Sequence, residues 1–548
     1  MSTHRSRYRR IAAILERHGL GLAAGLFGVG AWIPFNKGAL GHARRDEPYT
    51  SPDHVRLALE ELGPTFIKLG QLLSTRTDLL PPSYLDELAK LQDAAPAESW
   101  EPIKAVIREE LGADPEQVFA HFDTRPLAAA SIGQAYAATL HDGTQVVVKV
   151  RRPGVVTQVA EDLEILQNLA ERAGRRWETA HQYNLPGIVE EFSRTLRAEL
   201  DYLQEGRSAE RIATNFADSP DVAIPRVFWE TTTTRVLTLE RMHGIRVDDV
   251  PALDAAGIDR TQLAQRGANL ILTMIFEHRF FHADPHPGNM FVQPDGSIAL
   301  IDFGMVGQLE EHVTDQLSDV LLTFTHGDAD ALTTALLTLS TTKNTPDRDD
   351  LRRSLAAFIS HYRDRPLAEI NLTRLLGQLL ALLRQHHLQL PQETALLFKV
   401  LMMAEGLAAE LDPQFEMLQA LTPFTERLVQ AQLSLPAMAK RWAQASADAG
   451  ALLLDLPATL RRMRQILETT GFEVHLRAAE LEPLVRRAER TGNRLIAGLL
   501  AAALINGIGQ LVSANPKSRS PQGAMIGAGA SAVTALGGYL LWTARRQR

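Results

Sequence analysis

Cysteine is absent from this chain of 548 residues. Its absence excludes disulfide bonds, zinc sites built from thiolates and cysteine nucleophiles, and it points to no particular redox compartment. An excess of basic residues is absent as well, because the formal net charge is −8 at pH 7. Since duplex nucleic acids bind to basic surfaces, no nucleic acid partner is expected.

A secretory signal sequence is also not recognisable at the N-terminus. The first twenty residues are basic and apolar residues follow them, but Glu16, Arg17 and His18 interrupt the apolar stretch that a signal peptide requires. Residues 1–48 are therefore predicted to form a basic, amphipathic helical segment. Such a helix would pack on the protein body or lie at a membrane surface.

The overall composition is that of a folded protein, with 45% hydrophobic and 22% charged residues. Apolar residues spaced by three and four predict helices over residues 51–120 and again over most of residues 311–490. Between these regions, QAYAATL and QVVVKV flank HDGT, which predicts a β-hairpin with an Asp-Gly turn. A second hairpin is predicted over residues 226–242. A small sheet lobe followed by a helical lobe is the order found in bilobal kinases.

Two apolar runs without a charged residue, residues 495–512 and 523–542, stand near the C-terminus. Each is close to the roughly 20 residues that a helix needs to cross a bilayer. Arginines flank both outer ends, so the positive-inside rule predicts a hairpin whose two ends face the cytoplasm. A soluble helical hairpin rich in Ala and Gly is the alternative. Gly523 and Gly527 form a GxxxG pair that would allow close helix packing and a homodimer.

The chemistry is concentrated in HADPHPGN and IDFG, which carry Asp284, Asn289 and Asp302. Phosphoryl transfer from ATP requires a carboxylate near the acceptor and oxygen ligands for Mg²⁺. Protein kinases space the catalytic Asp and a metal-binding Asn as D-x-x-x-x-N, and a second metal-binding Asp follows in D-F-G. We predict that Asp284 positions or deprotonates the attacking group, and that Asn289 and Asp302 hold Mg²⁺.

The stretch between these motifs, MFVQPDGSIAL, predicts a strand, a turn and a strand, which would bring Asn289 back beside Asp302. His286 and Pro287 are interpreted as residues that shape the catalytic loop. The structural alternative is a buried polar turn, but burying two carboxylates is costly without a metal or another cation.

Lys149 stands late in the strand VVVKV, after a hairpin turn, as the phosphate-binding lysine of kinases does. Its partner is expected on the helical stretch over residues 186–216, where Glu199, Asp201 and Glu205 are candidates. On one helix, Asp201 and Glu205 would share a face, whereas Glu199 and Asp201 would point to different sides. Spacing alone does not select among the three.

The glycine-rich loop that covers the phosphates in protein kinases is missing. In its place stands PLAAASIGQAY, which contains Ala128, Ala129, Ala130 and Ser131. Alanines leave the backbone amides available to a phosphate but restrict positive φ, so this loop is expected to be stiffer than a glycine-rich one. The residues predicted to line the nucleotide are Ala128, Ala129, Ala130, Ser131 and Lys149, together with Glu240 and Met242 at the end of the second hairpin.

Taken in order, these motifs resemble those of the UbiB/AarF family of atypical kinase-like proteins, relatives of the mitochondrial ADCK proteins. IKLGQ at residues 67–71 matches the K-x-G-Q motif of that family, AAAS its Ala-rich loop, and ELD at residues 199–201 its E-x-D motif. HADPHPGN and DFG match its catalytic and metal loops. The resemblance covers residues 50–310 by motif and the whole chain by arrangement, and bacterial members also carry a C-terminal membrane anchor.

The resemblance implies a helical extension that folds over the active site and excludes a protein substrate. It implies that Lys68 pairs with Glu199, which leaves Glu205 as the partner of Lys149. From the helix pattern alone, Lys68 would be taken for a solvated lysine. Ala283 replaces the Arg of the kinase H-R-D motif, which removes a docking point for an activation-loop phosphate and favours a constitutive or differently gated enzyme.

We therefore predict a membrane-anchored, Mg²⁺-dependent ATPase or phosphotransferase that supports the biosynthesis of ubiquinone or a related isoprenoid quinone. Its expected partners are ATP, a membrane lipid or quinone precursor, and other quinone-biosynthesis proteins, and it is expected at the cytoplasmic face of the inner membrane. One alternative is a small-molecule kinase, because aminoglycoside and choline kinases share a similar catalytic loop. Another is a nucleotide-sensing scaffold of a membrane complex.

The predicted fold is α+β, with a bilobal kinase-like body, an N-terminal helical extension and a C-terminal transmembrane hairpin. The predicted segments are the basic N-terminus (1–48), the extension (49–125), the sheet lobe (126–245), the helical lobe (246–440), a helical linker (441–492) and the hairpin (493–548).

Overall fold

The computed structural model describes residues 2–18, 52–91, 97–176, 184–342, 346–363, 365 and 369–433. Among the helices in these ranges, none is long and apolar enough to cross a bilayer. The predicted membrane spans at residues 495–512 and 523–542, and the predicted linker before them, lie outside the described residues.

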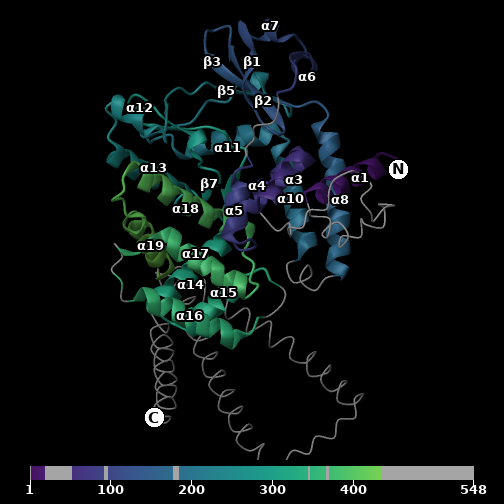
Figure 1. The fold of residues 1–548 in the computed structure, drawn as a ribbon. Coiled ribbons are helices and arrows are strands. Elements are labelled where there is room, and N and C mark those ends of the chain that lie inside the picture. Colours follow the sequence, from purple (N-terminus) through teal and green to yellow (C-terminus); the bar gives the residue numbers. More distant parts are fainter. Residues whose placement is uncertain are drawn as a thin grey trace, which may run out of the picture. The chain divides into compact units, whose positions relative to one another are not determined.

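A four-stranded antiparallel sheet with the order β1-β2-β3-β5 forms the first lobe (Figure 1). Its strands are β1 (His121–Ala129), β2 (Gly133–Thr139), β3 (Gln145–Arg151) and β5 (Val236–Glu240). The hairpin predicted around the Asp-Gly turn is confirmed, because β2 pairs with β3 along their whole length. Alternate valines of β3 (Val146, Val148 and Val150) are fully buried in a core shared with α6 (Trp100–Leu111).

Two features of this sheet differ from the prediction. Strand β1 extends across residues 125 and 126, where the boundary between the extension and the sheet lobe was predicted. The sequence did not indicate this strand, because its buried residues do not alternate and its register shifts at Pro126. The second hairpin has only one regular arm, β5, since residues 226–231 pair with it through a single bridge, Val227↔Leu239. There the Thr232 hydroxyl accepts the Thr238 N–H, so a side chain replaces a backbone partner.

The helical extension consists of α3 (Pro52–Leu62), α4 (Pro64–Thr75) and α5 (Pro82–Ala89). Helix α1 (Ser2–Arg17) packs beside it and against α8 (Val155–Arg176). Ile11, Ala12 and Ile14 of α1 are buried in one cluster with Phe66 of α4 and Ile165 of α8. Of the predicted segment 1–48, Ser2–Arg17 form a helix, and this helix packs on the protein body.

The helical stretch predicted over residues 186–216 is broken into α10 (Leu185–Glu199) and α11 (Tyr202–Asn215). Asp201 leaves the helical conformation, and its carboxylate accepts the Leu203 N–H as the N-cap of α11. The expectation that Asp201 and Glu205 share a face of one continuous helix was therefore wrong. Glu199 ends the first helix and Glu205 lies in the first turn of the second, so the two carboxylates can serve different partners.

The helical lobe is built around α13 (Arg260–Phe276) and α18 (Gln392–Leu411), which pack together along their length. Around them lie α14 (Glu311–His326), α15 (Ala329–Leu339), α16 (Arg348–Arg363), α17 (Leu372–Gln385) and α19 (Met417–Leu433). The catalytic segments are held by the short strands β7 (Phe280–His282), β8 (Met290–Val292), β9 (Ile298–Leu300) and β10 (Val306–Gln308). The predicted strand, turn and strand before Asp302 are confirmed by the antiparallel pair of β8 and β9.

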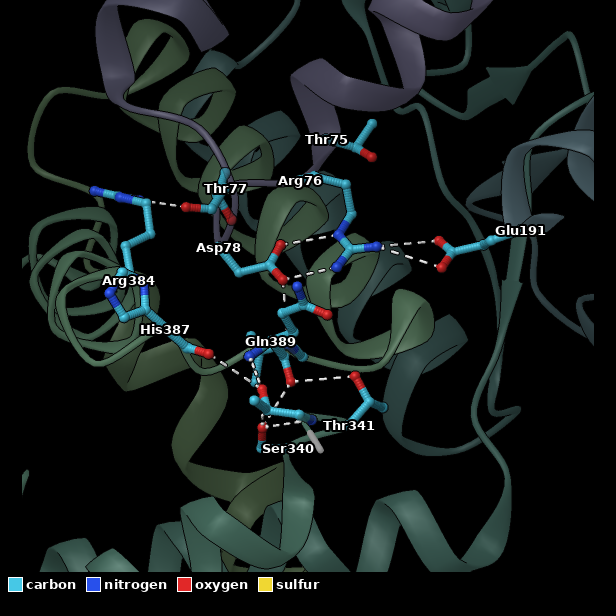
Figure 2. Close-up of polar contacts among 12 residues, drawn as sticks. Thr75, Arg76, Thr77, Asp78, Glu191, Ser340, Thr341, Arg384, His387 and Gln389 are labelled. Carbon is cyan, nitrogen blue, oxygen red and sulfur yellow. Dashed lines mark hydrogen bonds and ion pairs between the residues drawn. The ribbon is translucent and has the colours of Figure 1, made fainter. Parts of the chain in front are cut away.

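A buried polar network joins the extension to the helical lobe (Figure 2). Arg76, just after α4, lies between Asp78 (Nη2–Oδ2, 2.8 Å) and Glu191 of α10 (Nη1–Oε1, 3.2 Å). The side chain of Arg76 is 3% exposed and that of Asp78 is 0% exposed. Asp78 Oδ2 also accepts the Leu390 N–H at 3.1 Å, and Arg384 donates to the Thr77 carbonyl. The segment between α4 and α5 is thus fixed to the turn between α17 and α18.

Candidate functional site

A cavity of about 450 Å³ lies between the sheet lobe and the catalytic segments, within the size range of small-molecule sites. The predicted site residues that line it are Lys68, Ala128, Ala130, Lys149, Glu199, Glu205, Glu240, Met242, Asn289 and Asp302. Val147, Leu239 and Phe291 add apolar surface. The predicted residues Ala129, Ser131 and Asp284 are not part of this lining.

Lys149 on β3 links two carboxylates at the inner wall of the cavity. Its Nζ lies 2.5 Å from Glu205 Oε1 and 3.4 Å from Asp302 Oδ1. Among the three candidates for its partner, the structure selects Glu205. Glu205 Oε1 also accepts the Phe303 N–H at 3.3 Å, so the same carboxylate holds the lysine and the backbone of the DFG segment.

Lys149, Glu205 and Asp302 shift one another's pKa. Burial alone would lower the pKa of Lys149, but the negative charges of Asp302 and Glu205 outweigh it and raise that pKa. The Lys149 ammonium in turn lowers the pKa of Asp302 to about 2. Burial raises the pKa of Glu205 despite the opposing effect of Lys149. A protonated lysine and an ionised Asp302 at neutral pH are the charge states that a metal and nucleotide site requires.

Asp302 and Asn289 contribute side-chain oxygen atoms to the lining of the cavity. Asp302 has a left-handed backbone (φ 62°), and its side chain is 50% exposed. The Ile301 N–H donates to the Asn289 carbonyl at 2.9 Å, which keeps the two residues adjacent. The Asn289 amide nitrogen donates to the Asp284 carbonyl at 3.1 Å, and its amide oxygen is the atom that could bind a metal.

Asp302 and Asn289 fit a magnesium ion whose remaining ligands come from a nucleotide and from water. No group of three or more His, Asp or Glu side chains arranged as a metal cage occurs within the described ranges. Mg²⁺ usually takes only one or two protein oxygens, and phosphate and water oxygens complete its octahedron. Asp302 and Asn289 would hold it in this way.

The catalytic loop is organised by His282, which is fully buried. Its Nε2 lies 3.2 Å from the Ile301 carbonyl, and its Nδ1 accepts the Asp284 N–H at 3.1 Å. These contacts fit a neutral imidazole that carries its proton on Nε2. One ring therefore connects Asp284 to the strand that leads into Asp302.

The loop then turns at His286 and Pro287, as the sequence analysis expected. The His286 ring accepts the Gly288 N–H at 3.1 Å, and Pro287 begins a single turn of 3₁₀ helix that ends at Asn289. The Asp284 side chain is 38% exposed and is not among the residues that line the cavity, and its Oδ1 lies 3.3 Å from Lys399 Nζ on α18.

The Ala-rich segment does not form the open loop that was predicted. Ala128 and Ala129 are paired in the ladder between β1 and β2, and the Ala130 N–H donates to the Gly133 carbonyl at 2.8 Å. The Ala130 amide is therefore used inside a tight turn and is not available to a phosphate. Ser131 is fully buried, so this segment contributes apolar surface to the cavity through Ala128 and Ala130.

The K-x-G-Q segment divides between the site and the packing of the extension. Lys68 of α4 forms an ion pair with Glu199 at the edge of the cavity, and both side chains are less than one-sixth exposed. A Cβ atom on Gly70 would lie 2.1 Å from Leu91 Cδ1. The Gln71 amide donates to the Leu91 carbonyl at 2.8 Å. Only the lysine faces the cavity, and the glycine and glutamine hold α4 against the end of α5.

Known protein families and relatives match most of this chain. The family model of the ABC1 atypical kinase-like domain matches residues 90–336, and that of the UbiB helical domain matches residues 355–416. A protein of Xylella fastidiosa named "Probable protein kinase UbiB" is 38% identical over 69% of this chain and 70% of its own length. The chain belongs to the ABC1/UbiB family of atypical kinase-like proteins.

Other members are similarly close to this UbiB-family chain. An uncharacterised Synechocystis protein is 37% identical over 79% of this chain and 75% of its own length. The chloroplastic protein "ACTIVITY OF BC1 COMPLEX KINASE 7" of Arabidopsis thaliana is 33% identical over 87% of this chain and 69% of its own length. The resemblance inferred from the five motifs is confirmed.

Sequence reasoning missed three residues of this UbiB-family site. His282 connects the two catalytic segments, Tyr202 lies against the turn at Gly133, and Lys399 contacts Asp284. Lys399 left a signal in the sequence, since it is the only charged residue in the run ALLFKVLMMA. Tyr202 left none, because its position depends on the break between α10 and α11.

Proposed function

We propose that this chain is a membrane-anchored, Mg²⁺-dependent ATPase or phosphotransferase that supports the biosynthesis of ubiquinone or a related isoprenoid quinone. The observation that carries the proposal is the placement of Glu205 and Asp302 within 3.4 Å of Lys149 Nζ at the wall of a cavity of nucleotide size. The naming of a relative as a probable protein kinase UbiB supports the kinase-like part.

In this proposal the sheet lobe binds ATP and the catalytic segments act on its phosphates. Lys149 binds the α- and β-phosphates, and Glu205 keeps its ammonium aimed into the cavity. When bound, Mg²⁺ supplies positive charge that neutralises the phosphate oxygens. Asn289 and Asp302 hold that ion. Asp284 positions or deprotonates the acceptor, which is water or a hydroxyl compound.

The paired Lys68 and Glu199 restrict which acceptors can enter. Both line the cavity, and the extension that carries Lys68 is anchored to the helical lobe by the buried network around Arg76. A protein substrate would have to displace this cover. The proposal therefore favours water, a membrane lipid or a quinone precursor as the acceptor, and it places the C-terminal runs of residues 495–512 and 523–542 in the inner membrane with the catalytic lobes on the cytoplasmic side.

One assay tests the enzymatic part. ADP release from Mg-ATP is measured with the purified full chain, with and without phospholipid vesicles and a phenol that resembles a quinone precursor, beside an Asp302→Asn variant. We expect turnover that requires Asp302 and that lipid increases. No Asp302-dependent turnover under any condition would leave a nucleotide-sensing scaffold as the better account. Transfer of labelled phosphate to a small hydroxyl compound would instead indicate a small-molecule kinase.

A further inference from the structure

The catalytic loop receives a cation from a different part of the chain. Lys399 Nζ lies 3.3 Å from Asp284 Oδ1. Lys399 is on α18, within residues 355–416 that match the UbiB helical domain, whereas Asp284 is within the kinase-like domain at residues 90–336. The loop itself has no such group, because residues 280–292 contain neither lysine nor arginine.

The backbone of Asp284 is already fixed, so this contact acts on the carboxylate alone. The Asp284 N–H donates to the His282 ring, and the Asp284 carbonyl accepts from the His286 N–H at 2.7 Å and from the Asn289 amide at 3.1 Å. Of the described cations, Lys399 is the one in contact with the carboxylate. It contacts one of the two carboxylate oxygens, Oδ1.

Lys399 occupies a largely buried position, where an ammonium group costs free energy compared with an exposed surface site. Its neighbours Phe398 and Val400 are 8% and 0% exposed, and the lysine side chain itself is 19% exposed. Partial burial of an ammonium costs free energy that a solvated pair does not recover. Asp284 is 38% exposed, and a pair this accessible contributes about 0–1 kcal/mol to folding at most. Stability is thus a poor explanation for the lysine.

We propose that Lys399 is a positioning residue for Asp284, and this inference rests on the proposed function. By holding Oδ1, Lys399 leaves Oδ2 to face the acceptor. Oδ2 takes the proton of the acceptor O–H as its oxygen forms a bond to the γ-phosphorus. The bond from that phosphorus to the bridging oxygen breaks, and ADP leaves with the electron pair. The proton then passes from the half-exposed Asp284 to solvent. The helical domain thereby completes the active site of the kinase-like domain.

The test uses the full chain and the ADP-release assay. Lys399→Met is expected to lower kcat roughly ten- to hundredfold, the range for a misplaced catalytic group, with the KM for ATP within about twofold of the parent. Lys399→Arg should restore most of kcat, because a guanidinium can still hold Oδ1. The matched control is Lys104→Met, which removes a lysine of similar exposure (26%) that pairs with Glu116 at 3.1 Å and does not line the cavity. It should leave both constants unchanged.

A double variant separates positioning from structure. In an Asp284→Asn background, Lys399→Met should cause little further loss, because both changes remove the same function. A Lys399→Met enzyme with parental kcat, or a loss that adds fully to that of Asp284→Asn, would overturn the inference. So would a loss that Lys399→Arg does not relieve while the melting temperature falls. If Asp284→Asn and Asp302→Asn retain parental turnover, the proposed function itself fails, and the inference fails with it.

Discussion

Asp302 stands in a backbone conformation that few residues other than glycine adopt. Its φ of 62° lies in the left-handed region, where Asp and Asn are tolerated better than most side chains. The Gly304 N–H, 3.3 Å from Asp302 Oδ1, and the Phe303 N–H, bonded to Glu205, hold the segment in place. These contacts hold Asp302 in this strained conformation, in which it lines the cavity.

The charge of Asp302 gives a prediction about pH. Lys149 lowers its pKa to about 2, below the ordinary value of 3.8, so the ionised form favours the folded state above pH 3.8 and this contribution is lost as the pH falls toward 2. Mg²⁺-dependent binding of a fluorescent ADP analogue should therefore keep its affinity from pH 7.5 to 5. A titration midpoint inside that window that disappears in Asp302→Asn would contradict this assignment.

Gly133 is required by a close approach of α11 to the sheet. A Cβ atom there would lie 2.1 Å from the Tyr202 hydroxyl and 3.0 Å from the Val150 carbonyl. Gly133→Ala should destabilise the protein by about 1–3 kcal/mol, as overpacking does. It should also weaken nucleotide binding, because the turn beside the cavity must shift. The opposite sign is expected for Gly406→Ala, since nothing lies near that helical position and alanine favours a helix. Thermal unfolding of both variants checks this pair.

At the level of secondary-structure elements, a buried ion-pair network connects the segment after α4 to α10 and to the turn before α18. Arg76 and Asp78 are almost completely buried, and Glu191 completes the hydrogen bonds of Arg76 (Figure 2). The Leu390 N–H donates to Asp78. Buried ion pairs contribute little compared with apolar residues, but removal of one partner leaves a charge without compensation. This network therefore acts less as a source of stability than as a device that specifies where the extension docks.

Arg76→Met should cost about 3–5 kcal/mol of stability, because Asp78 would remain buried and charged. Arg353→Met is the control, since Arg353 pairs with Asp350 on the surface, and a change there should cost about 0–1 kcal/mol. Urea unfolding measures both. Equal midpoints for the two variants would show that the buried network has no special role.

The element scale also shows what could be predicted from the sequence. Period and turn chemistry were sufficient for the β2–β3 and β8–β9 hairpins, because Asp-Gly and Pro-Asp-Gly turns act locally. They failed for β1, where Pro126 and a register shift remove the alternation. They also failed at Asp201, because a capping residue inside an apolar period resembles helix interior.

In the candidate site, too, some residues could be predicted from the sequence alone and others could not. Asp284, Asn289 and Asp302 were recognisable from spacing, since one loop and one hairpin bring them together. The pairs of Lys68 with Glu199 and of Lys149 with Glu205 needed the family resemblance. Lys399 could not be assigned, because its contact with Asp284 spans 115 residues and depends on how two lobes pack.

At the scale of the whole molecule, the proposal requires a membrane. Deletion of residues 493–548 should release the protein from the membrane fraction, because the two apolar runs lie within that segment. Extraction with alkaline carbonate, followed by immunoblotting of pellet and supernatant, measures this. The full chain should stay in the pellet. Recovery of the full chain in the supernatant would refute the anchor and favour a soluble hairpin.

The bond from the Leu390 N–H to Asp78 also has a consequence for the timing of synthesis. These residues are 312 positions apart in the chain. At about 5–20 residues per second, a ribosome needs roughly 15–60 s to travel from one to the other. By then the strands, Lys149 and the DFG segment have left the ribosome or are leaving it. All residues that line the cavity are therefore synthesised before Leu390, and the bond that fastens the segment after α4 to the helical lobe can form only after them.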